Sequence, residues 1–563
     1  MKKFTTAIAL VLCLVMCAMA FSACGSKKKK NNTATGGDET TPTTTVVTTD
    51  KWEDLGKEVS ALAASNRSFK IEFDSYKDAE RAARNDVYVA GPDADGYETA
   101  SAIEQMVYER NKAACDLLGV TVEYDYWSNY GWGAQAKQIN TVVQGNDPNA
   151  PDVFVFMLYD LLRAMRTNGS FKDIWSIPGS YFDFNAQGWM KDWMESLSFT
   201  GDRAYILGSD YFIDIFRNMG VLPFNVDLMD ANGSKLSKAL FGAEGLAAGE
   251  TMSQRFFDYV ESGNWTWDSL GLLCQAIWDD KDNDSMSSIK DTLGIITESY
   301  SGMPAAIILY STGEALTEVK QVADPTDPNK FTQTITYPDT SAVLGGIFDA
   351  VAGVYSGNGA LVTTSENKGT TEDDPGMAYH YQKFAQDEVL FTDPSLLGKL
   401  EDDVFQQMQS LYSVVPLPKV SVGKEYNTLI HNTADVGAIN VNTDPGKAKV
   451  ITAFFEYCTE HSKEIREEFL EIVTKYKTTT YNQGTDRMLN LIYERVVNAR
   501  DKAIEDAALG SSGFRFHGKL KDWKFVEGAD RIEEEYKSQI DSKRTAVEEV
   551  IAEWYQLPKV DAE

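Results

Sequence analysis

The chain contains 563 residues, of which 43% are hydrophobic and 24% charged, and its 84 acidic and 53 basic residues give a net charge of −31. This length allows about two to four domains, and the composition excludes a collagen-like or fully disordered chain. Because such negative charge repels nucleic acid, we do not expect binding to DNA or RNA. The four histidines are far apart and no HExxH motif occurs, which argues against a catalytic zinc site.

The first fifty residues have the pattern of an exported lipoprotein. A short basic start precedes a wholly apolar run at 7–21, which is too short to span a bilayer comfortably and is typical of a signal peptide. The run ends in Phe21-Ser22-Ala23-Cys24-Gly25, which resembles a bacterial lipobox. We therefore expect a signal peptide over 1–23, lipidation of Cys24, and anchoring at the extracellular face of the cell membrane. The alternative is an ordinary secretory signal with an incidental cysteine.

The next stretch, 24–50, contains four consecutive lysines and is otherwise rich in Thr, Gly and Asn. It has too few apolar residues to form a core, so it is expected to be a flexible tether. Elsewhere in the sequence, no run of 18 apolar residues occurs. The expected product is a globular protein tethered outside the membrane.

Strand and helix patterns alternate after the tether. Alternating apolar residues predict strands at 69–73 and 120–124, and the continuous apolar run Val153-Phe154-Val155-Phe156 predicts a buried parallel strand. Helical spacing predicts helices in three further stretches, 101–118, 133–143 and 158–167. This alternation implies βαβ units and a parallel sheet.

The order of short motifs along the chain resembles a known family. Ala150-Pro151-Asp152 precedes the buried strand, Trp265-Thr266-Trp267-Asp268 begins a helix with Thr266 as its N-cap, and Pro416-Leu417-Pro418-Lys419 comes late. Further segments of this kind are 117–122, 168–174, 201–207, 220–225, 384–391, 437–440 and 487–492. Together they resemble the extracellular solute-binding proteins of bacterial ABC importers, specifically the carbohydrate-type family 1.

This resemblance implies an α/β, two-lobed, periplasmic-binding-protein-like fold of type II, with a cleft between the lobes. It implies a small solute, an oligosaccharide, held by hinge closure, and docking to ABC permease subunits. No catalytic residue and no cofactor are expected. The implied division is a first part of lobe 1 at 51–218, lobe 2 at 219–433, a return to lobe 1 at 434–475 and a C-terminal helical region at 476–563.

Ligand-binding residues are expected just after strands, because the carboxyl ends of parallel strands line the crevice of such folds. Aromatic rings would cover the apolar faces of a sugar, and Asp160 would accept hydrogen bonds from its hydroxyl groups. The alternative is that the rings pack within the lobe and Asp160 caps a helix. The candidate residues are Tyr126, Trp127, Asn129, Trp132, Tyr159, Asp160, Tyr211, Glu298 and Tyr300.

An acidic stretch suggests a structural calcium site. Asp280, Asp282 and Asp284 occupy positions 1, 3 and 5 of an EF-hand-like loop, Met286 offers a backbone carbonyl at position 7, and Asp291 is at position 12. Position 6 is serine where glycine is usual, so the alternative is a solvated acidic turn.

Two other classes of protein stay open. A secreted glycoside hydrolase needs only two carboxylates about 5 to 10 Å apart. Because the chain has 84 acidic residues, its sequence does not exclude such a pair. A cell-surface adhesin is the other alternative, although it would not need this order of motifs. The sequence has no GxSxG motif, no P-loop and no GxGxxG motif after a strand.

Overall fold

The structure is a computed structural model that describes part of the chain. The described residues run from 51 to 555, with gaps at 75–100, 128–132, 166–168, 200, 243–244, 324–330, 337, 364–376, 476–482, 507–514 and 538.

A four-stranded sheet contains the three strands that the sequence predicts. Its order is β12-β3-β1-β2, formed by β12 (Asp435–Ile439), β3 (Val153–Met157), β1 (Ser68–Asp74) and β2 (Thr121–Trp127). β1 runs parallel to both β2 and β3, whereas β12 is antiparallel to β3. β3 is buried along its whole length, as its continuous apolar sequence predicts.

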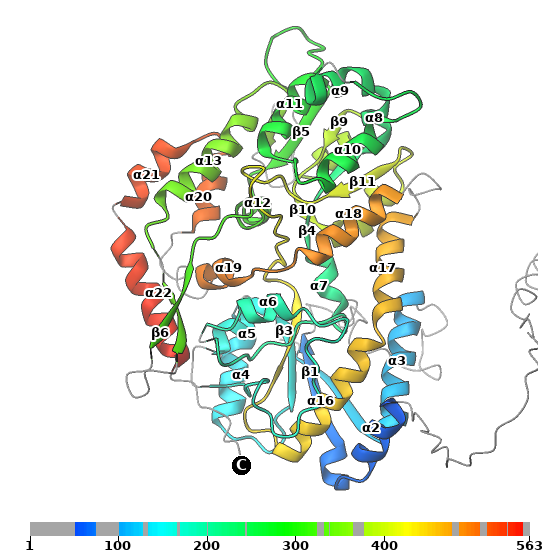
Figure 1. Cartoon of the computed structure of the whole chain (residues 1–563), viewed down its shortest axis with the longest axis vertical. Helices are drawn as coiled ribbons and strands as arrows, with labels where there is room; N and C mark the ends of the chain where they lie inside the picture. Colours follow the sequence, from blue (N-terminus) through cyan, green and yellow to red (C-terminus); the bar gives the residue numbers. More distant parts are fainter. Residues whose placement is uncertain are drawn as a thin grey trace, which may run out of the picture. The chain divides into compact units, whose positions relative to one another are not determined.

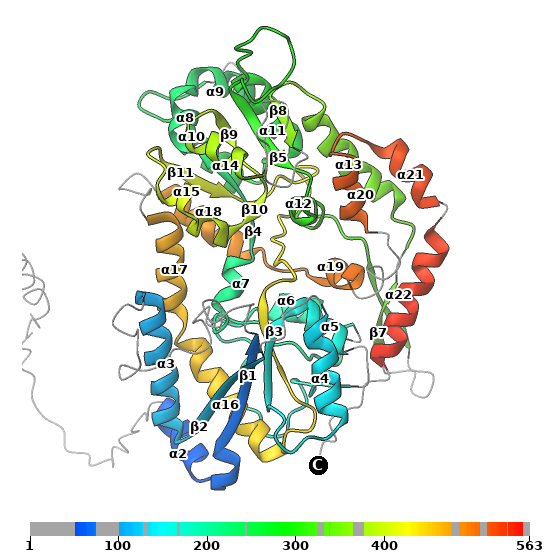
Figure 2. The same ribbon diagram turned by 180° about the vertical axis from the view of Figure 1, so that it is seen from behind.

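Helices cover this sheet on both sides. α3 (Ala102–Leu118) begins with a capping box between Ser101 and Glu104, and it ends at Gly119, whose φ of 62° is left-handed. α4 (Ala134–Gln144) and α5 (Leu158–Met165) lie on the opposite side of the sheet from α3 and α16 (Pro445–Glu460), as Figures 1 and 2 show. The predicted helices are therefore confirmed. α2 (Lys51–Ser60) and the 3-10 turn η1 (Ala64–Arg67) precede β1, and α6 (Lys191–Ser196) follows α5.

A second sheet has six strands and mixed directions. Its order is β10-β4-β9-β5-β8, and β11 also pairs with β4. β5 runs parallel to β8 and β9, and β4 is antiparallel to β9, β10 and β11. These strands are β4 (Gly220–Asn225), β5 (Leu293–Glu298), β8 (Ala360–Thr363), β9 (Val389–Phe391), β10 (Ser395–Leu396) and β11 (Tyr412–Val415).

The helices around the second sheet include one whose start the sequence predicts. α11 (Trp267–Ile277) is capped by Thr266, whose side chain accepts a hydrogen bond from the Ser269 amide, as expected. The others are α8 (Val226–Ala231), α9 (Gly233–Phe241), α10 (Met252–Glu261), α12 (Met303–Tyr310), α13 (Ser341–Tyr355), α14 (Met377–Ala385), η4 (Leu397–Glu401) and α15 (Asp403–Gln406).

The chain crosses between the two sheets through β4 and β12, and again through α17 (Lys463–Lys475), which leads from α16 to α18 (Gln483–Glu494) beside β11 and α10. It leaves the first sheet through α7 (Ile213–Arg217) into β4, and it returns into β12. The first two of these crossing segments are paired with each other, because Met219 forms a β-bridge with Ile430. The two-lobed α/β fold class is confirmed, whereas the domain boundaries stay a prediction.

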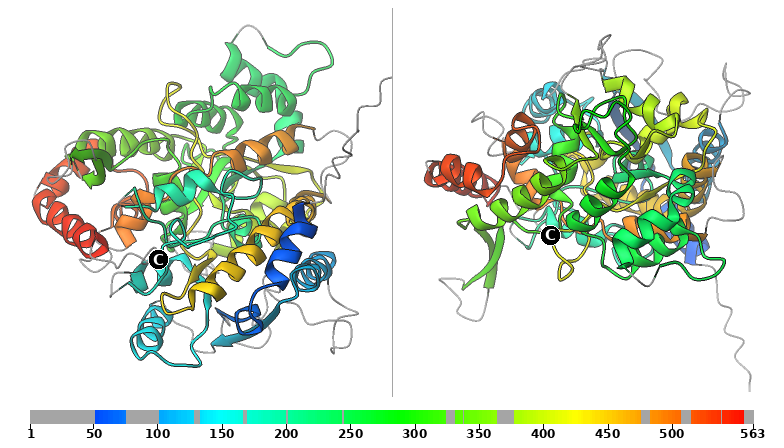
Figure 3. Two further views of the ribbon diagram at one scale, coloured as in Figure 1. Left: turned by 60° about the horizontal axis from the view of Figure 1, so that its bottom comes forward. Right: turned by 90° about the horizontal axis from the view of Figure 1, so that it is seen from above.

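The C-terminal part consists of helices, and a hairpin packs beside it. α17 (Lys463–Lys475), α18 (Gln483–Glu494), α19 (Arg500–Ile504), α20 (Phe516–Asp522), α21 (Ala529–Lys537) and α22 (Ile540–Tyr555) follow one another along the chain. α20 packs against α12, α21 against α13, and α22 against the hairpin of β6 (Glu318–Ala323) and β7 (Phe331–Thr336). Figure 3 shows the red C-terminal helices beside the green helix α13.

Candidate functional site

The carboxyl end of β3 leads directly into Tyr159 and Asp160, in the first turn of α5. Asp160 is fully buried, and its Oδ1 accepts a hydrogen bond from the Ala136 amide at 3.1 Å. Burial raises the pKa of this carboxyl group to about 6, against the lowering effect of the backbone amides of Ala136 and Gly133. Within the described ranges its Oδ2 has no hydrogen-bond partner. Asp160 therefore caps the N-terminus of α4, and its second oxygen is buried.

The aromatic residues near this edge have different surroundings. The Tyr159 ring lies 5.0 Å from the Arg163 guanidinium and is buried. Trp127 packs against Phe154 and Phe156, with ring centroids 6.0 and 5.1 Å away, whereas Tyr126 is 50% exposed. Asn129 and Trp132 lie outside the described residues. The structure thus places Tyr126 at the surface and Trp127 against the sheet.

Tyr211 lies in the core. Its side chain has no exposed surface, its ring packs edge-on against Phe212 and Phe455, and the Arg110 guanidinium lies 4.3 Å from the ring centroid. These contacts show that the Tyr211 ring packs within the core.

The carboxyl ends of β5 and β9 meet at a buried polar cluster. Glu298 is the last residue of β5, and its carboxylate accepts hydrogen bonds from the amide and hydroxyl groups of Ser301. Its own amide donates to Asp393 Oδ1 at 3.2 Å, two residues after β9. Tyr300, two residues after Glu298, is 41% exposed.

Two members of this cluster, Asp393 and His380, are not among the candidates from the sequence. His380 Nε2 lies 3.7 Å from Asp393 Oδ2, and both side chains are at most 1% exposed. Burial and the nearby charge of Glu298 raise the pKa of Asp393 well above its usual range, and burial lowers the pKa of His380 to about 3. Asp393 follows a strand end just as Glu298 does, so the same rule applied to Thr392-Asp393 would have found it. His380 is on α14 and carries no such signal.

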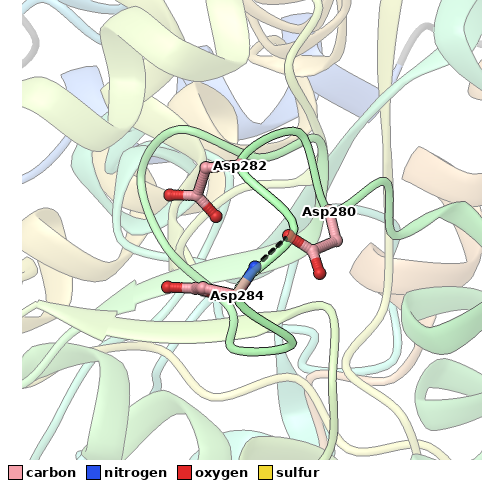
Figure 4. Close-up of side chains that lie close together, drawn as sticks. All are labelled: Asp280, Asp282 and Asp284. Atoms are coloured by element: carbon pink, nitrogen blue, oxygen red, sulfur yellow. Dashed lines mark hydrogen bonds between the residues drawn. The ribbon is translucent and has the colours of Figure 1, made fainter.

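The predicted calcium loop brings three of its five residues together. Carboxylate oxygens of Asp280, Asp282 and Asp284 lie within 4.8 Å of one another, and Figure 4 shows them around the turn. Partial desolvation and the charges of Asp284 and Asp291 raise the pKa of Asp282.

The other two predicted ligands of this loop are placed differently. Asp291 is fully buried, and its two oxygens accept hydrogen bonds from the amides of Lys281 and Ser288, which close the loop. The Met286 side chain is 64% exposed, and its amide donates to Asp284.

The N-terminal predictions fall outside the described part of the chain, which excludes Cys24 and both predicted N-terminal segments. Among the helices that the structure describes, none combines the length and the apolar character required to cross a membrane.

Comparisons with known proteins give similarity at the level of fold. No family model and no curated protein matches the sequence. A family 1 extracellular solute-binding protein from Bifidobacterium longum subsp. infantis is similar at 14% identity and a TM-score of 0.46, over 87% of this chain and 99% of that one. The GacH receptor of Streptomyces glaucescens GLA.O, solved unliganded and with acarbose, is similar at 13% identity and a TM-score of 0.42, over 84% and 99% of the two chains.

A third similar structure is the cyclic α-maltosyl-1,6-maltose binding protein of Arthrobacter globiformis, with 11% identity and a TM-score of 0.44, over 86% of this chain and 98% of that one. Many of the similar structures are solute-binding proteins of ABC transporters. The similar protein from Bifidobacterium longum subsp. infantis is a member of family 1, the family that the order of motifs resembles.

Proposed function

We propose that this chain is the lipid-anchored, solute-binding component of an ABC importer, and that it captures a carbohydrate by hinge closure. The observation that supports this most is the topology. In each of the two sheets, the carboxyl ends of the parallel strands lie at one edge, and two paired segments carry the chain between the sheets. Polar groups that follow the strand ends, Asp160 in one sheet and Glu298 and Asp393 in the other, are of the type that binds hydroxyl groups.

The experiment is a thermal-shift screen of residues 51–563 against mono- and oligosaccharides, amino acids and peptides. A ligand present at 100 times its dissociation constant adds about 2.7 kcal/mol of stability. A shift with saccharides alone supports the proposal and names the size of the solute. A shift with amino acids or peptides alone contradicts the carbohydrate assignment but still supports the proposal that the protein binds a solute.

The proposed protein performs no chemistry on its ligand. A glycoside hydrolase is the alternative, since Glu298 and Asp393 are neighbouring carboxyl groups at one edge. Chromatography of the ligand after incubation separates the two: an intact saccharide supports a binding protein, and a cleaved one supports the hydrolase.

We also propose that Cys24 carries the lipid anchor, on the basis of the lipobox-like sequence before it. In bacterial cells, Cys24→Ser is expected to abolish labelling by palmitate. Labelling of the variant equal to that of the wild type would contradict this proposal.

A structural calcium ion in the loop 280–291 is a further proposal, supported by the close approach of Asp280, Asp282 and Asp284. Calcium is expected to raise the melting temperature of the wild type and to have no effect on Asp282→Asn. Asp116→Asn, which changes an exposed carboxylate on α3, is the control and should respond like the wild type. Equal responses from all three proteins would contradict the site.

A further inference from the structure

Two C-terminal segments, 495–506 and 515–522, are held together by a buried acidic side chain, and we call them the strap. Glu505, just after α19, accepts a hydrogen bond from the Phe516 amide at 2.6 Å, and its other oxygen lies 2.5 Å from His517 Nδ1 on α20. Glu505 is 1% exposed and His517 is 7% exposed. α19 and α20 therefore form one connected unit.

The strap contacts the segments that follow β5 of the second sheet. Asp501 accepts hydrogen bonds from the Leu316 amide at 3.0 Å and the Thr317 hydroxyl at 2.6 Å, shortly after α12. Lys521 Nζ donates to the carbonyl oxygen of Tyr300 at 3.2 Å. The strap thus reaches the strand-end edge where Glu298 lies.

The strap also contacts the first sheet's side of the molecule. The Ala499 amide donates to Ser196 Oγ of α6 at 2.8 Å, and Asn432 Nδ2 donates to Asp506 Oδ2 at 2.7 Å. The carbonyl oxygen of Asn432 in turn accepts from the amide of Tyr159 at 2.9 Å, just after the end of β3. Figures 1 and 2 both show α19 between α12 and α6.

A buried ion pair fixes the carboxylate that makes this second contact. Lys502 Nζ lies 2.6 and 2.7 Å from the two oxygens of Asp506, and the side chains are 6% and 1% exposed. Removing one partner of such a pair leaves an uncompensated buried charge, which is costly. Because Lys502 binds both oxygens of Asp506, this ion pair holds the carboxylate in the orientation in which Asn432 donates to it.

We propose that the strap fastens the strand-end edges of the two sheets to each other and restrains their relative motion. Both edges contain predicted ligand residues, Tyr159 in one and Glu298 with Tyr300 in the other, so the restraint acts where hinge closure would act. The inference rests on contacts within the chain and needs no solute.

Hydrogen exchange of the 51–563 protein, followed by mass spectrometry, tests the strap. Asn432→Ala deletes one hydrogen bond to the strap, and such a loss corresponds to about threefold to tenfold faster opening. We expect this increase in α5 and, across the strap, in α12. Asn442→Ala is the matched control: it removes a carboxamide bond of 2.8 Å to the Val143 carbonyl, away from the strap, and should leave α12 unchanged.

Ser196→Ala provides an independent variant, since it removes the acceptor of the Ala499 amide at another point of contact. It too should increase exchange in α12. An increase confined to 428–434 in Asn432→Ala and to α6 in Ser196→Ala, with α12 unchanged, would overturn the proposal.

Discussion

Glu505 is an acidic side chain in the protein interior that is expected to keep its charge. Burial alone would raise its pKa, but the charges of His517 and Lys502 hold it at about 2, below the ordinary value of 4.5. The folded state therefore binds fewer protons than the unfolded state between these values. The stabilisation is fully present above about pH 4.5 and is lost as the pH falls through about 2, and this shift corresponds to about 3 kcal/mol.

Glu505→Gln should lower the free energy of unfolding by about 3 kcal/mol at pH 6, and the difference from the wild type should narrow as the pH falls below about 4.5. Urea denaturation at several pH values measures this. Glu533→Gln, which breaks an exposed ion pair with Lys537, is the control and should change stability by less than about 1 kcal/mol. A difference for Glu505→Gln that is the same at pH 3 and pH 6 would contradict the assignment.

At the residue scale, the rule that ligand groups follow strand ends is only partly informative. It selected Asp160 and Glu298, which do lie at the carboxyl ends of β3 and β5. It also selected Tyr211, whose ring packs in the core, and it passed over Asp393. His380 reaches the same cluster from a helix distant in sequence, and no local pattern predicts such a tertiary contact.

At the element scale, the contact between β5 and α11 depends on one glycine. A Cβ at Gly294 would lie 2.2 Å from Cys274 Cα, which is backbone and cannot move aside as a side-chain end can. Gly294→Ala should therefore separate the strand from the helix and destabilise the protein by about 1 to 3 kcal/mol, the usual cost of overpacking.

The control for this prediction is Gly353→Ala on α13, where nothing lies within 4 Å of the added Cβ. This substitution should stabilise the protein by about 0.5 to 1 kcal/mol, because alanine favours a helix interior over glycine. Thermal or urea unfolding compares the two variants. Equal stability of both would show that the strand and helix tolerate separation without cost.

Elements with strong local signals could be predicted, and those that depend on distant partners could not. Alternation and caps located β1, β2, β3, α3 and α4 within a few residues, since Ser101 and Gly119 mark both ends of α3. The β6–β7 hairpin was not predicted, although its two strands flank the turn-rich stretch Asp-Pro-Thr-Asp-Pro-Asn at 324–329. The place of α19 was also unpredictable, because it follows from side-chain contacts with segments such as Leu316–Thr317, far away in the sequence.

At the scale of the whole molecule, the chain builds its two sheets in an interleaved order. The first sheet is completed only when β12 returns to pair with β3, after more than 200 residues spent mainly in the second sheet. The two paired crossing segments, the helix α17 and the strap all connect the two sheets. The order of family-like motifs predicted the two-lobed arrangement, and the motifs at 220–225 and 437–440 coincide with β4 and β12.

We propose that a single solute closes the two sheets around it. Small-angle X-ray scattering of residues 51–563 tests this most directly, with and without a saturating concentration of the saccharide that gives the largest thermal shift. We predict a smaller radius of gyration in the bound protein, and intact saccharide after the measurement. An unchanged radius of gyration at saturation, or a cleaved saccharide, would contradict capture by closure.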